Sequence, residues 1–404
     1  MSKLEKLIQQ YCPDGVEYVR LGDVMSIQRG ASPRPIQNYL TDDEYGIPWI
    51  KIGDVSIESK YITSTKERVT KEGAAKSRFL KRGSFILSNS MSFGRPYILE
   101  IDGCIHDGWI SMCDFEKHLL PDFLYYLLRS SVVQDFWISK ANSGGAVTNL
   151  NSDIVRSTLI PVPPLPVQEE IVRILDAFTE LQAELQAELQ KRKQQYNFYR
   201  DNLLNFKDIN RGGQEIKWMK LGDVAYYVKN RITSSSITTS NYVSVENLLQ
   251  DKQGKTIASN VPDGCLIHYE PGDVLIGNIR PYLKKIWLAN GDGGTNGDVL
   301  TIRADRKFLS PEFLYQCLAS DDFFQYDMSH AKGAKMPRGS KEDVMNYKIP
   351  ITSLSEQQKI VDILDRFDTL TNDLTSGLPA EMEKRRQQYE FYRDKLLTFK
   401  RKEA

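Results

Sequence analysis

The segment KRKQQYNFYRDNLLNFK, from Lys191 to Lys207, returns almost unchanged as KRRQQYEFYRDKLLTFK, from Lys384 to Lys400. Thirteen of the seventeen positions are identical, at an offset of 193 residues in a chain of 404. Because the offset is about half of the chain, the repeat indicates one duplication and not a solenoid of many short units.

Shorter matches keep the same order along both halves of the chain. The matching pairs are VRLGDV (19–24) with MKLGDV (219–224), PDFLYYLLRS (121–130) with PEFLYQCLAS (311–320), and IPVPPLPVQEEIVRILDAF (160–178) with IPITSLSEQQKIVDILDRF (349–367). The similarity is weak in the front section of each half and strong at its end. The sequence therefore predicts two related halves whose front sections have diverged.

Apolar residues at the end of each half recur at steps of three and four, which is typical of one face of a helix. The residues expected to pack are Ile171, Phe178, Leu181, Leu185, Tyr196, Tyr199, Leu203 and Phe206 in the first copy, and Ile360, Phe367, Leu370, Leu374, Tyr389, Tyr392, Leu396 and Phe399 in the second. Such seams demand mutual burial, so we expect two long helical regions packed as an antiparallel coiled coil. Gly377 and Pro379 predict a break near 376–380 in the second region, whereas the first is expected to run on unbroken.

The front sections combine β-rich runs with helical stretches, which predicts an α+β fold of two mixed α/β domains with an internal repeat. Strands are expected within 47–55, 84–90 and 272–279, a helix over 121–139, and a hairpin turn at NGDGGTNGD (290–298). The predicted parts are 1–16 (a short N-terminal helix), 17–160 (first front section), 161–210 (central helical region), 211–348 (second front section) and 349–404 (C-terminal helical region).

The bulk composition narrows the class of protein. The chain has 53 basic and 53 acidic residues, which argues against general electrostatic coating of nucleic acid. Its five cysteines contain no C-x-x-C pair, which fits reduced thiols in the cytoplasm. We expect no signal peptide and no membrane span, because no apolar stretch is long enough.

Two divergent front sections, each closed by a near-duplicate helical region, resemble the specificity subunit of type I restriction–modification systems. The two phrases beginning IPVPPLPVQ and IPITSLSEQ are similar to that family's proline-rich start of a conserved helix, and each keeps a glutamine, Gln168 or Gln357. The second copy departs from the pattern because Thr352 and Ser353 replace a Pro-Pro pair.

The resemblance implies that each front section, 17–160 or 211–348, is a recognition domain that reads one half of a bipartite site in double-stranded DNA. It implies a circular pseudo-two-fold repeat, in which the helix of segment 1–16 completes the distal helical region, and it makes 161–210 and 349–404 helical spacers. It also implies that the helices set the spacing of the half-sites and dock two methyltransferase subunits, which restriction subunits join. The subunit itself is implied to lack catalysis and cofactors. S-adenosylmethionine, Mg²⁺ and ATP are expected in the partner subunits.

Candidate DNA contacts are the basic and amide side chains of loops and strand ends in the two front sections. They are Arg29, Arg34, Lys76, Arg78, Ser90, Ser92, Arg95, Lys140, Asn142, Thr148 and Asn149 in the first, and Lys229, Arg231, Asn278, Arg280, Lys332, Lys335, Arg338 and Lys341 in the second. The alternative for each is an ordinary solvated loop or a structural turn.

Three other hypotheses are open at this point. Glu58 and Lys60, with Asp42 and Asp43 upstream, could form a metal-dependent nuclease core. Cys104, His106 and Cys113 could supply part of a zinc site, although a fourth ligand is missing from view. Finally, the front sections could bind proteins and not DNA.

Overall fold

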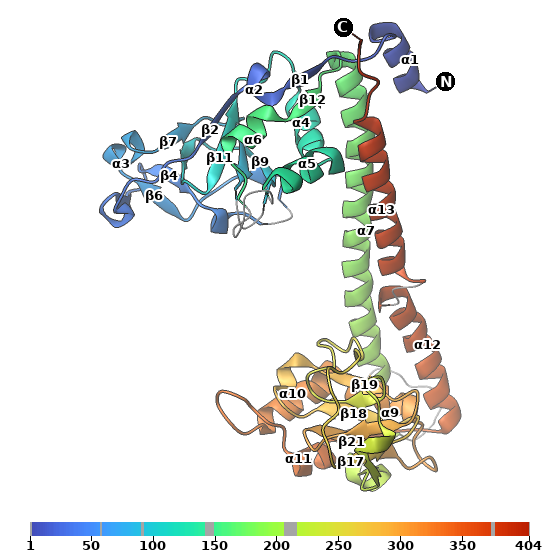
Figure 1. The fold of residues 1–404 in the computed structure, drawn as a ribbon. Helices are drawn as coiled ribbons and strands as arrows, with labels where there is room; N and C mark the ends of the chain where they lie inside the picture. Colours follow the sequence, from blue (N-terminus) through green and yellow to red (C-terminus); the bar gives the residue numbers. More distant parts are fainter. Residues whose placement is uncertain are drawn as a thin grey trace. The chain divides into compact units, whose positions relative to one another are not determined.

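The computed structural model describes residues 2–56, 59–89, 93–141, 149–205, 216–372 and 376–403. The chain divides into two compact units: unit 1 is residues 1–183 with 384–404, and unit 2 is residues 184–383. Each unit therefore contains one front section and one copy of the repeated segment (Figure 1). The copy in unit 1 comes from the C-terminal end of the chain.

Two five-stranded sheets build the front section of unit 1. In spatial order, one sheet is β2 (Ser26–Arg29), β11 (Trp109–Cys113), β8 (Phe85–Ser88), β9 (Pro96–Leu99) and β5 (Tyr61–Ile62). The other is β3 (Leu40–Thr41), β6 (Glu67–Val69), β4 (Ile47–Ile50), β10 (Gly103–Ile105) and β7 (Arg78–Leu80). Strands β8 and β9 are buried along their whole length, so they lie in the core of this lobe.

Short helices complete the lobe of unit 1. They are α2 (Leu21–Val24), η1 (Ile36–Asn38), η2 (Ile52–Asp54), α3 (Lys71–Ala75), α4 (Pro121–Leu128), α5 (Ser131–Ala141) and α6 (Ser152–Ser157). The single helix expected over 121–139 is thus two helices. The Ser130 hydroxyl donates to the Leu127 carbonyl at 2.7 Å, and the chain turns there before α5 begins.

The front section of unit 2 contains two four-stranded sheets. One is β14 (Ala225–Tyr227), β21 (Val299–Ala304), β18 (Val274–Gly277) and β19 (Ile286–Leu288); the other is β15 (Arg231–Thr233), β17 (Cys265–Tyr269), β20 (Gly293–Thr295) and β16 (Tyr242–Val243). Its short helices are α8 (Leu221–Val224), η4 (Ser234–Ser236), η5 (Pro281–Leu283), α9 (Pro311–Leu318), α10 (Asp321–His330) and α11 (Lys341–Asn346).

The expected hairpin turn at 290–298 is wrong, because part of it is the buried strand β20. A Cβ on Gly293 would lie 2.1 Å from the carbonyl oxygen of Asn241. Glycine is needed there to let neighbouring backbone come close, and the sequence signal of a turn arose from that need.

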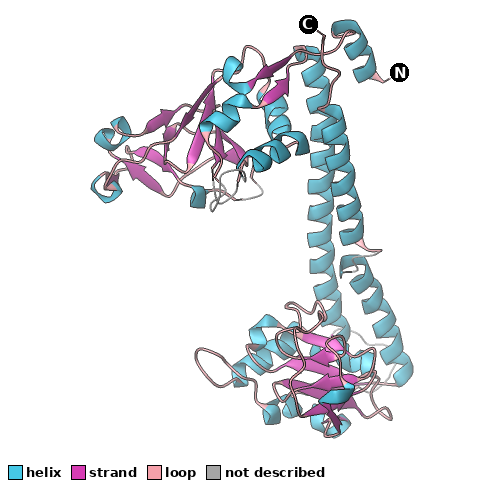
Figure 2. Cartoon of the chain, viewed as in Figure 1, coloured by secondary structure: helices cyan, strands magenta, loops and turns pink. Residues whose placement is uncertain are grey.

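Three long helices carry the repeated segments: α7 (Leu165–Asn205), α12 (Leu354–Asn372) and α13 (Leu378–Leu396) (Figure 2). The first region runs unbroken for 41 residues, as expected. In unit 1 the start of α7 packs antiparallel to α13, where Phe178 stacks on Tyr392 at 5.6 Å. In unit 2 the end of α7 packs against α12, where Phe367 stacks on Tyr199 at 5.3 Å.

The seam differs in detail from the predicted one. Leu370 is exposed, whereas Leu175 and Leu364, absent from the prediction, are fully buried. Each helix faces a lobe as well as its partner helix, and this second contact selects a different set of apolar positions. Predicted seam residues Phe206 and Leu374 lie outside the described side chains.

The remaining predicted seam residues are placed as follows. Ile171, Tyr196, Leu203, Ile360 and Tyr389 are buried. Leu181, Leu185, Leu396 and Phe399 are half-buried.

The two ends of the chain meet within unit 1. The amide of Val16 donates to the carbonyl of Lys400 at 2.8 Å, and the amide of Lys402 donates to Val16 at 2.9 Å. Strand β1 (Tyr18–Arg20) then pairs antiparallel with β12 (Leu159–Pro161), directly before α7. The corresponding pair in unit 2 is β13 (Lys217–Lys220) with β22 (Lys348–Ile351).

The N-terminal helix α1 (Lys3–Tyr11) also belongs to this closure of unit 1. Its Lys3 forms an ion pair with Glu170 of α7 at 2.7 Å, and Leu4 is buried in the core of the unit. Among the described residues, no helix is both long and apolar enough to cross a membrane.

One glutamine in each half holds the long helix to its lobe. Gln168 accepts the Leu120 amide at 2.9 Å and donates to the carbonyls of His118 and Pro163 at 2.8 and 2.7 Å. Gln357 makes the same three bonds in unit 2, with Ser310, Phe308 and Thr352. Both side chains are fully buried, so the glutamine of the proline-rich phrase has a structural role.

Candidate nucleic-acid interface

Two predicted DNA contacts of unit 1, Arg29 and Asn149, line two adjoining hollows together with Asn89, which was not predicted. Arg29 at the end of β2, Asn89 after β8 and Asn149 before α6 line both of them. The hollows have volumes of about 520 and 570 Å³. Each is large enough for a base edge or a phosphate, which makes this the candidate interface of unit 1.

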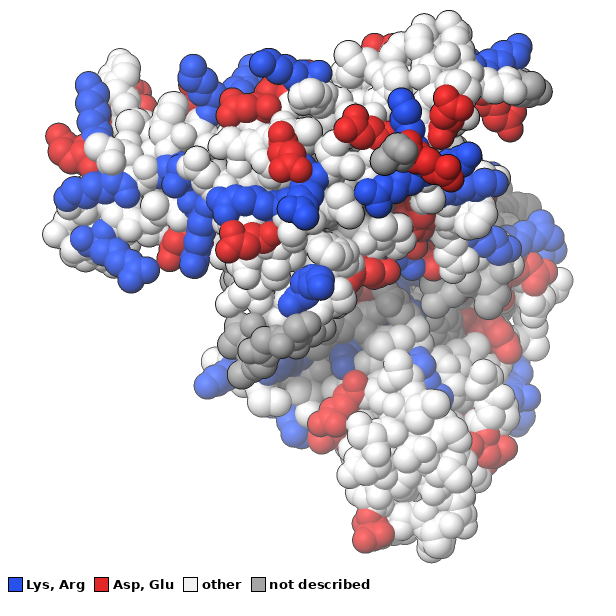
Figure 3. Space-filling model, turned by 45° about the horizontal axis from the view of Figure 1, so that its top comes forward, with Lys and Arg blue, Asp and Glu red and all other residues white. Residues whose placement is uncertain are grey.

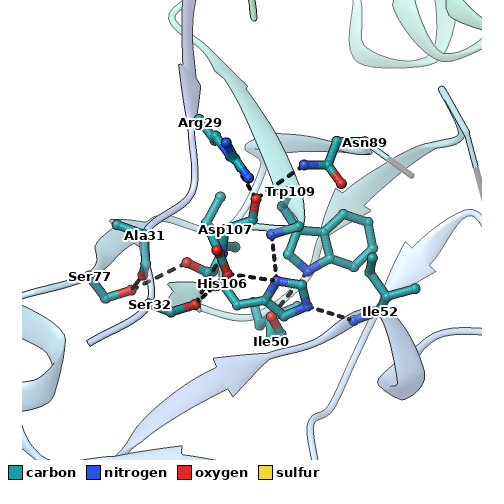
Figure 4. Close-up of polar contacts among 12 residues, drawn as sticks. Arg29, Ala31, Ser32, Ile50, Ile52, Ser77, Asn89, His106, Asp107 and Trp109 are labelled. Carbon is teal, nitrogen blue, oxygen red and sulfur yellow. Dashed lines mark hydrogen bonds and ion pairs between the residues drawn. The ribbon is translucent and has the colours of Figure 1, made fainter. Parts of the chain in front are cut away.

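Asp107 lies at the centre of this cluster, between β10 and β11 (Figure 4). Its main-chain carbonyl accepts from Arg29 Nε at 2.9 Å and from Asn89 Nδ2 at 3.1 Å. Its carboxylate accepts from the Ser32 hydroxyl at 2.7 Å and pairs with Arg34 at 3.4 Å. The Ser32 hydrogen bond is the main cause of a lowered pKa for Asp107, so the carboxylate is ionised at neutral pH.

The first hollow is bordered by further basic side chains. Arg78 Nε donates to the Arg29 carbonyl at 2.8 Å, and Arg78 also contacts Gln28. Arg156 Nη2 donates to the Ile27 carbonyl at 2.6 Å while its Nη1 pairs with Asp153. Such anchored guanidinium groups are suited to phosphate or guanine contacts.

His106 lines the second hollow, and its contacts indicate a structural role. Its Nδ1 accepts the amide of Gly108 at 2.6 Å, and burial lowers the pKa of the ring. The zinc hypothesis finds no support: Cys104 is buried against Trp49, and the described residues hold no group of three or more metal-binding side chains.

In unit 2 the predicted basic loop is docked on the end of β18. Lys332 and Arg338 exchange two backbone hydrogen bonds of 2.9 Å, which close the loop between them. The amide of Arg280 donates to the Pro337 carbonyl at 2.8 Å, and Arg338 Nη1 pairs with Asp298 at 2.8 Å. The structure thus brings Arg280, Lys332 and Arg338 together, with Lys335 exposed between the last two.

The two interfaces share one backbone arrangement. The amide of Asn89 donates to Gly108 and its carbonyl accepts from Leu150, at 3.1 and 2.8 Å. In unit 2, Asn278 donates to Asp298 and accepts from Gly339, at 2.9 and 3.1 Å. An asparagine directly after a buried strand therefore holds Leu150 before α6 in one lobe and Gly339 before α11 in the other. In the sequence, Ser88-Asn89 and Gly277-Asn278 stand at the ends of two matching β-rich runs. This match could have identified Asn89 as a candidate.

The side chain of Asn278 is buried, in contrast to the prediction of a DNA contact, and it lies beside the buried Asp327 of α10. A Cβ on Gly339 would lie 2.4 Å from Asp327 Oδ1 and 2.8 Å from Asn278 Oδ1. Neither carboxylate oxygen of Asp327, nor Asn278 Oδ1, has a hydrogen-bond partner among the described residues. Burial raises the pKa of Asp327 to about 6.

Several candidate contacts lie outside the two clusters. Lys76 contacts the Tyr39 hydroxyl, Lys140 lies 5.9 Å from the Phe136 ring, and Lys341 begins α11. Lys229 is exposed and precedes β15. Arg231, in β15, is also exposed, and its backbone pairs with Ile267. Arg95 interacts with Tyr97. The candidates Ser90, Ser92, Asn142 and Thr148 lie outside the described residues.

The nuclease hypothesis gains nothing from the structure. Lys60 forms an ion pair with Asp122 and lies over the Tyr125 ring at 4.9 Å, which accounts for its charge. Glu58 lies outside the described residues.

Acidic side chains lie among the basic ones on the face that Figure 3 shows, and large parts of that face carry neither charge. On a chain with 53 basic and 53 acidic residues, contact with DNA would depend on local clusters of the kind described above.

Comparisons with known proteins agree with this architecture. The family profile of the type I restriction modification DNA specificity domain matches residues 13–192 and again 214–384. The EcoR124I/EcoR124II specificity subunit of Escherichia coli is 31% identical over 320 residues, covering 73% of this chain and 74% of that one. The EcoprrI specificity subunit of Escherichia coli is 24% identical over 400 residues, covering 93% and 92%.

Solved structures show the same fold. A chain from a type I restriction–modification assembly aligns with a TM-score of 0.63 at 19% identity, over 95% of this chain and 97% of that one. The HsdS subunit of Thermoanaerobacter tengcongensis aligns with a TM-score of 0.52 at 18% identity, over 96% of both chains. With two matching domains, two lobes and their duplicated helices, this chain belongs to the family of type I restriction–modification DNA specificity subunits.

Proposed function

We propose that each lobe reads one half of a bipartite site in double-stranded DNA and that the chain performs no reaction of its own. The observation that carries this proposal is the pair of backbone hydrogen bonds that Asn89 and Asn278 make in the two lobes. The polar side chains near these bonds differ: Arg29, Arg78 and Asn149 in one lobe, and Arg280, Lys335 and Arg338 in the other. One scaffold with two different surfaces suits two different half-sites.

The proposed recognition domains are residues 17–160 and 211–348, with the segments 1–16, 161–210 and 349–404 forming the helical spacers. In this role the spacers set the distance between the half-sites and dock two methyltransferase subunits, which restriction subunits join. S-adenosylmethionine, Mg²⁺ and ATP would be bound by those partners. The complex would act in the cytoplasm, where it meets DNA.

Exchange of one lobe tests the proposal directly. Residues 17–160 are replaced by the corresponding lobe of another specificity subunit, and host DNA methylation is mapped with the natural methyltransferase present. We expect one half of the methylated sequence to change while the other half and the spacing stay the same.

The reciprocal exchange of residues 211–348 is the matched control, and it should change only the other half. A methylated sequence that stays the same after both exchanges would show that the lobes do not read DNA.

A further inference from the structure

The connection between β18 and β19 in unit 2 has an unusual backbone conformation. Its 3₁₀ turn η5 is flanked by Arg280 and Lys284, whose backbones are left-handed, with φ of 54° and 49°. Asp251 and Lys252, in another loop, are also left-handed, with φ of 52° and 67°. Residues other than glycine rarely adopt this conformation, and it persists only where surrounding contacts fix it. The turn must therefore be held from outside.

The contacts that hold the turn come from two other segments. The amides of Asp251 and Lys252 donate to the carbonyls of Leu283 and Lys284, each at 3.0 Å. The ammonium groups of Lys252 and Lys284 both donate to one carboxylate oxygen of Asp321, at 2.8 and 3.1 Å. Asp321 lies in the first turn of α10, so a Lys252–Asp321–Lys284 clamp ties the turn to that helix.

The negative charge of Asp321 is required by this clamp. Burial alone would raise the pKa of Asp321, but the hydrogen bonds and charges of the two lysines outweigh it and lower the pKa. The carboxylate is therefore ionised at neutral pH. The side chain of Lys252 is only 15% exposed, so solvent screens its charge poorly. Without the carboxylate, two ammonium groups that share one oxygen would repel each other at short range.

The turn presents an arginine at the candidate interface of unit 2. Arg280 is exposed, and no described residue pairs with its guanidinium, in contrast to Arg338, which pairs with Asp298. The amide of Arg280 donates to the Pro337 carbonyl at 2.8 Å, which joins the turn to the basic loop. An arginine at a fixed place is suited to a guanine edge, which it contacts through two parallel hydrogen bonds.

The same triplet, Arg-Pro-Tyr, has a different structure in unit 1. There Pro96 begins β9 and Tyr97 is buried. In unit 2, Pro281 begins η5 and Tyr282 is 51% exposed. Both triplets follow a buried strand, β8 or β18. The two lobes therefore differ in backbone at this point, as expected of elements that read different half-sites.

We propose that Arg280 reads a guanine in the half-site of unit 2 and that Asp321 is its positioning residue. Asp321 does not touch DNA. It holds Lys252 and Lys284, and through them the turn that carries Arg280. This inference rests on the proposed function. It adds the kind of base that is read and a residue outside the interface on which the reading depends.

The test uses the complete complex with its methyltransferase subunits, after its methylated sequence has been mapped. Binding is measured by competition with sites altered at each position. Arg280→Ala should relax the preference for guanine at one position by about tenfold. Asp321→Ala should relax the preference at that same position, and the double variant should lose no more than Arg280→Ala alone, because Asp321 acts through Arg280.

The matched control is Asp322→Ala, which removes an exposed carboxylate from the same turn of α10 and should keep the preference. Two further measurements separate positioning from unfolding. The half-site read by unit 1 should keep its preference in every variant. Peptides of β18 and β21 should keep their hydrogen-exchange protection.

Four outcomes would overturn the inference: no change of preference with Arg280→Ala or with Asp321→Ala, changes at different positions, additive losses in the double variant, or lost protection of β18 and β21 in Asp321→Ala. Each of these leaves the proposed function standing. A methylated sequence that stays the same after exchange of residues 211–348 would instead contradict the proposed function.

Discussion

Asp327 takes in unit 2 the position that Trp137 takes in unit 1, when Pro311 is aligned with Pro121. Trp137 is fully buried and its Nε1 donates to Thr158 at 2.8 Å. Asp327 is equally buried, but no described group donates a hydrogen bond to it. A buried carboxylate without a partner favours its protonated form, in which it can donate a hydrogen bond to a neighbour such as Asn278.

Replacing Asp327 by asparagine should therefore remove a pH dependence of stability. The pKa is raised from 3.8 to about 6, so the folded chain binds this proton more tightly than the unfolded chain. The stability that the proton contributes is present below about pH 4 and is lost as the pH rises to about 6, a loss on the order of 3 kcal/mol. Asp327→Asn should be more stable than the unchanged chain at pH 7.5 and close to it at pH 4, as measured by denaturant unfolding.

Burial raises the pKa of Asp327, and the electrostatic effect of His330 opposes that rise. Burial, and then the neighbouring Asp327, raise the pKa of Tyr227. The matched control is Asp322→Asn, an exposed carboxylate on the same helix, which should show no such difference. Equal pH profiles for Asp327→Asn and the unchanged chain would show that the carboxylate is not a buried, unpaired group.

Lys335 is expected to contribute charge but no base preference. It lies exposed in the loop closed by Lys332 and Arg338. Lys335→Ala in the assembled complex should weaken binding to all DNA sequences about equally and reduce the salt dependence of log K by roughly one. A changed preference at one base position, measured by competition with altered sites, would assign it a direct reading role instead.

At the scale of elements, the start of each long helix depends on one glutamine. Gln168 bonds one amide and two carbonyls, of which the Pro163 carbonyl is buried and the other two groups are partly buried. The same arrangement around Gln357 shows that the feature belongs to the repeat and not to one lobe. A short polar side chain thus fixes how a helix of 41 residues leaves its lobe.

Gln168→Ala should destabilise unit 1 by about 2–4 kcal/mol, because one buried and two partly buried backbone groups lose their partner. Gln357→Ala should do the same to unit 2. Hydrogen exchange resolved by peptide separates the two effects. Gln358→Ala, next to Gln357 but exposed, should change little; an equal loss of protection in that variant would mean that the buried hydrogen bonds are not the cause.

At the scale of the whole molecule, each unit combines segments that are distant in the sequence, and the repeated parts follow one another in circular order. Unit 1 takes its second long helix from the C-terminal end, while unit 2 takes the corresponding helix from the middle of the chain. The contacts of Val16 with Lys400 and Lys402 complete unit 1 across the two termini. Each unit thereby becomes a lobe with a pair of antiparallel helices.

Removal of residues 2–16 should destabilise unit 1 selectively. The deletion removes the buried side chains of Leu4, Cys12 and Val16 from its core. At about 1.5–3 kcal/mol for each large apolar side chain, the free energy of unfolding of unit 1 should fall by several kcal/mol. Peptides of unit 1 should lose hydrogen-exchange protection, while those of unit 2 should keep it. Equal loss in both units would contradict the division into two units.

The sequence by itself determined the duplication, the unbroken first helix, the two seams around Phe178 and Phe367, and the basic loop between Lys332 and Lys341. These features depend on residue order, on helical periodicity and on local charge, all of which can be read along the chain. The family resemblance followed from the same repeat.

Only the tertiary structure decided which residues meet at the candidate interfaces. Asn89, Asp107 and Arg156 are distant in sequence, and they line two adjoining hollows because β8 and β10 end there and β11 and α6 begin there. The same holds for the burial of Asn278, for the strand formed by Gly293 and Gly294, and for the closure of unit 1 by its two termini. Such contacts follow from strand pairing between distant segments, which the composition and spacing of either segment alone do not encode.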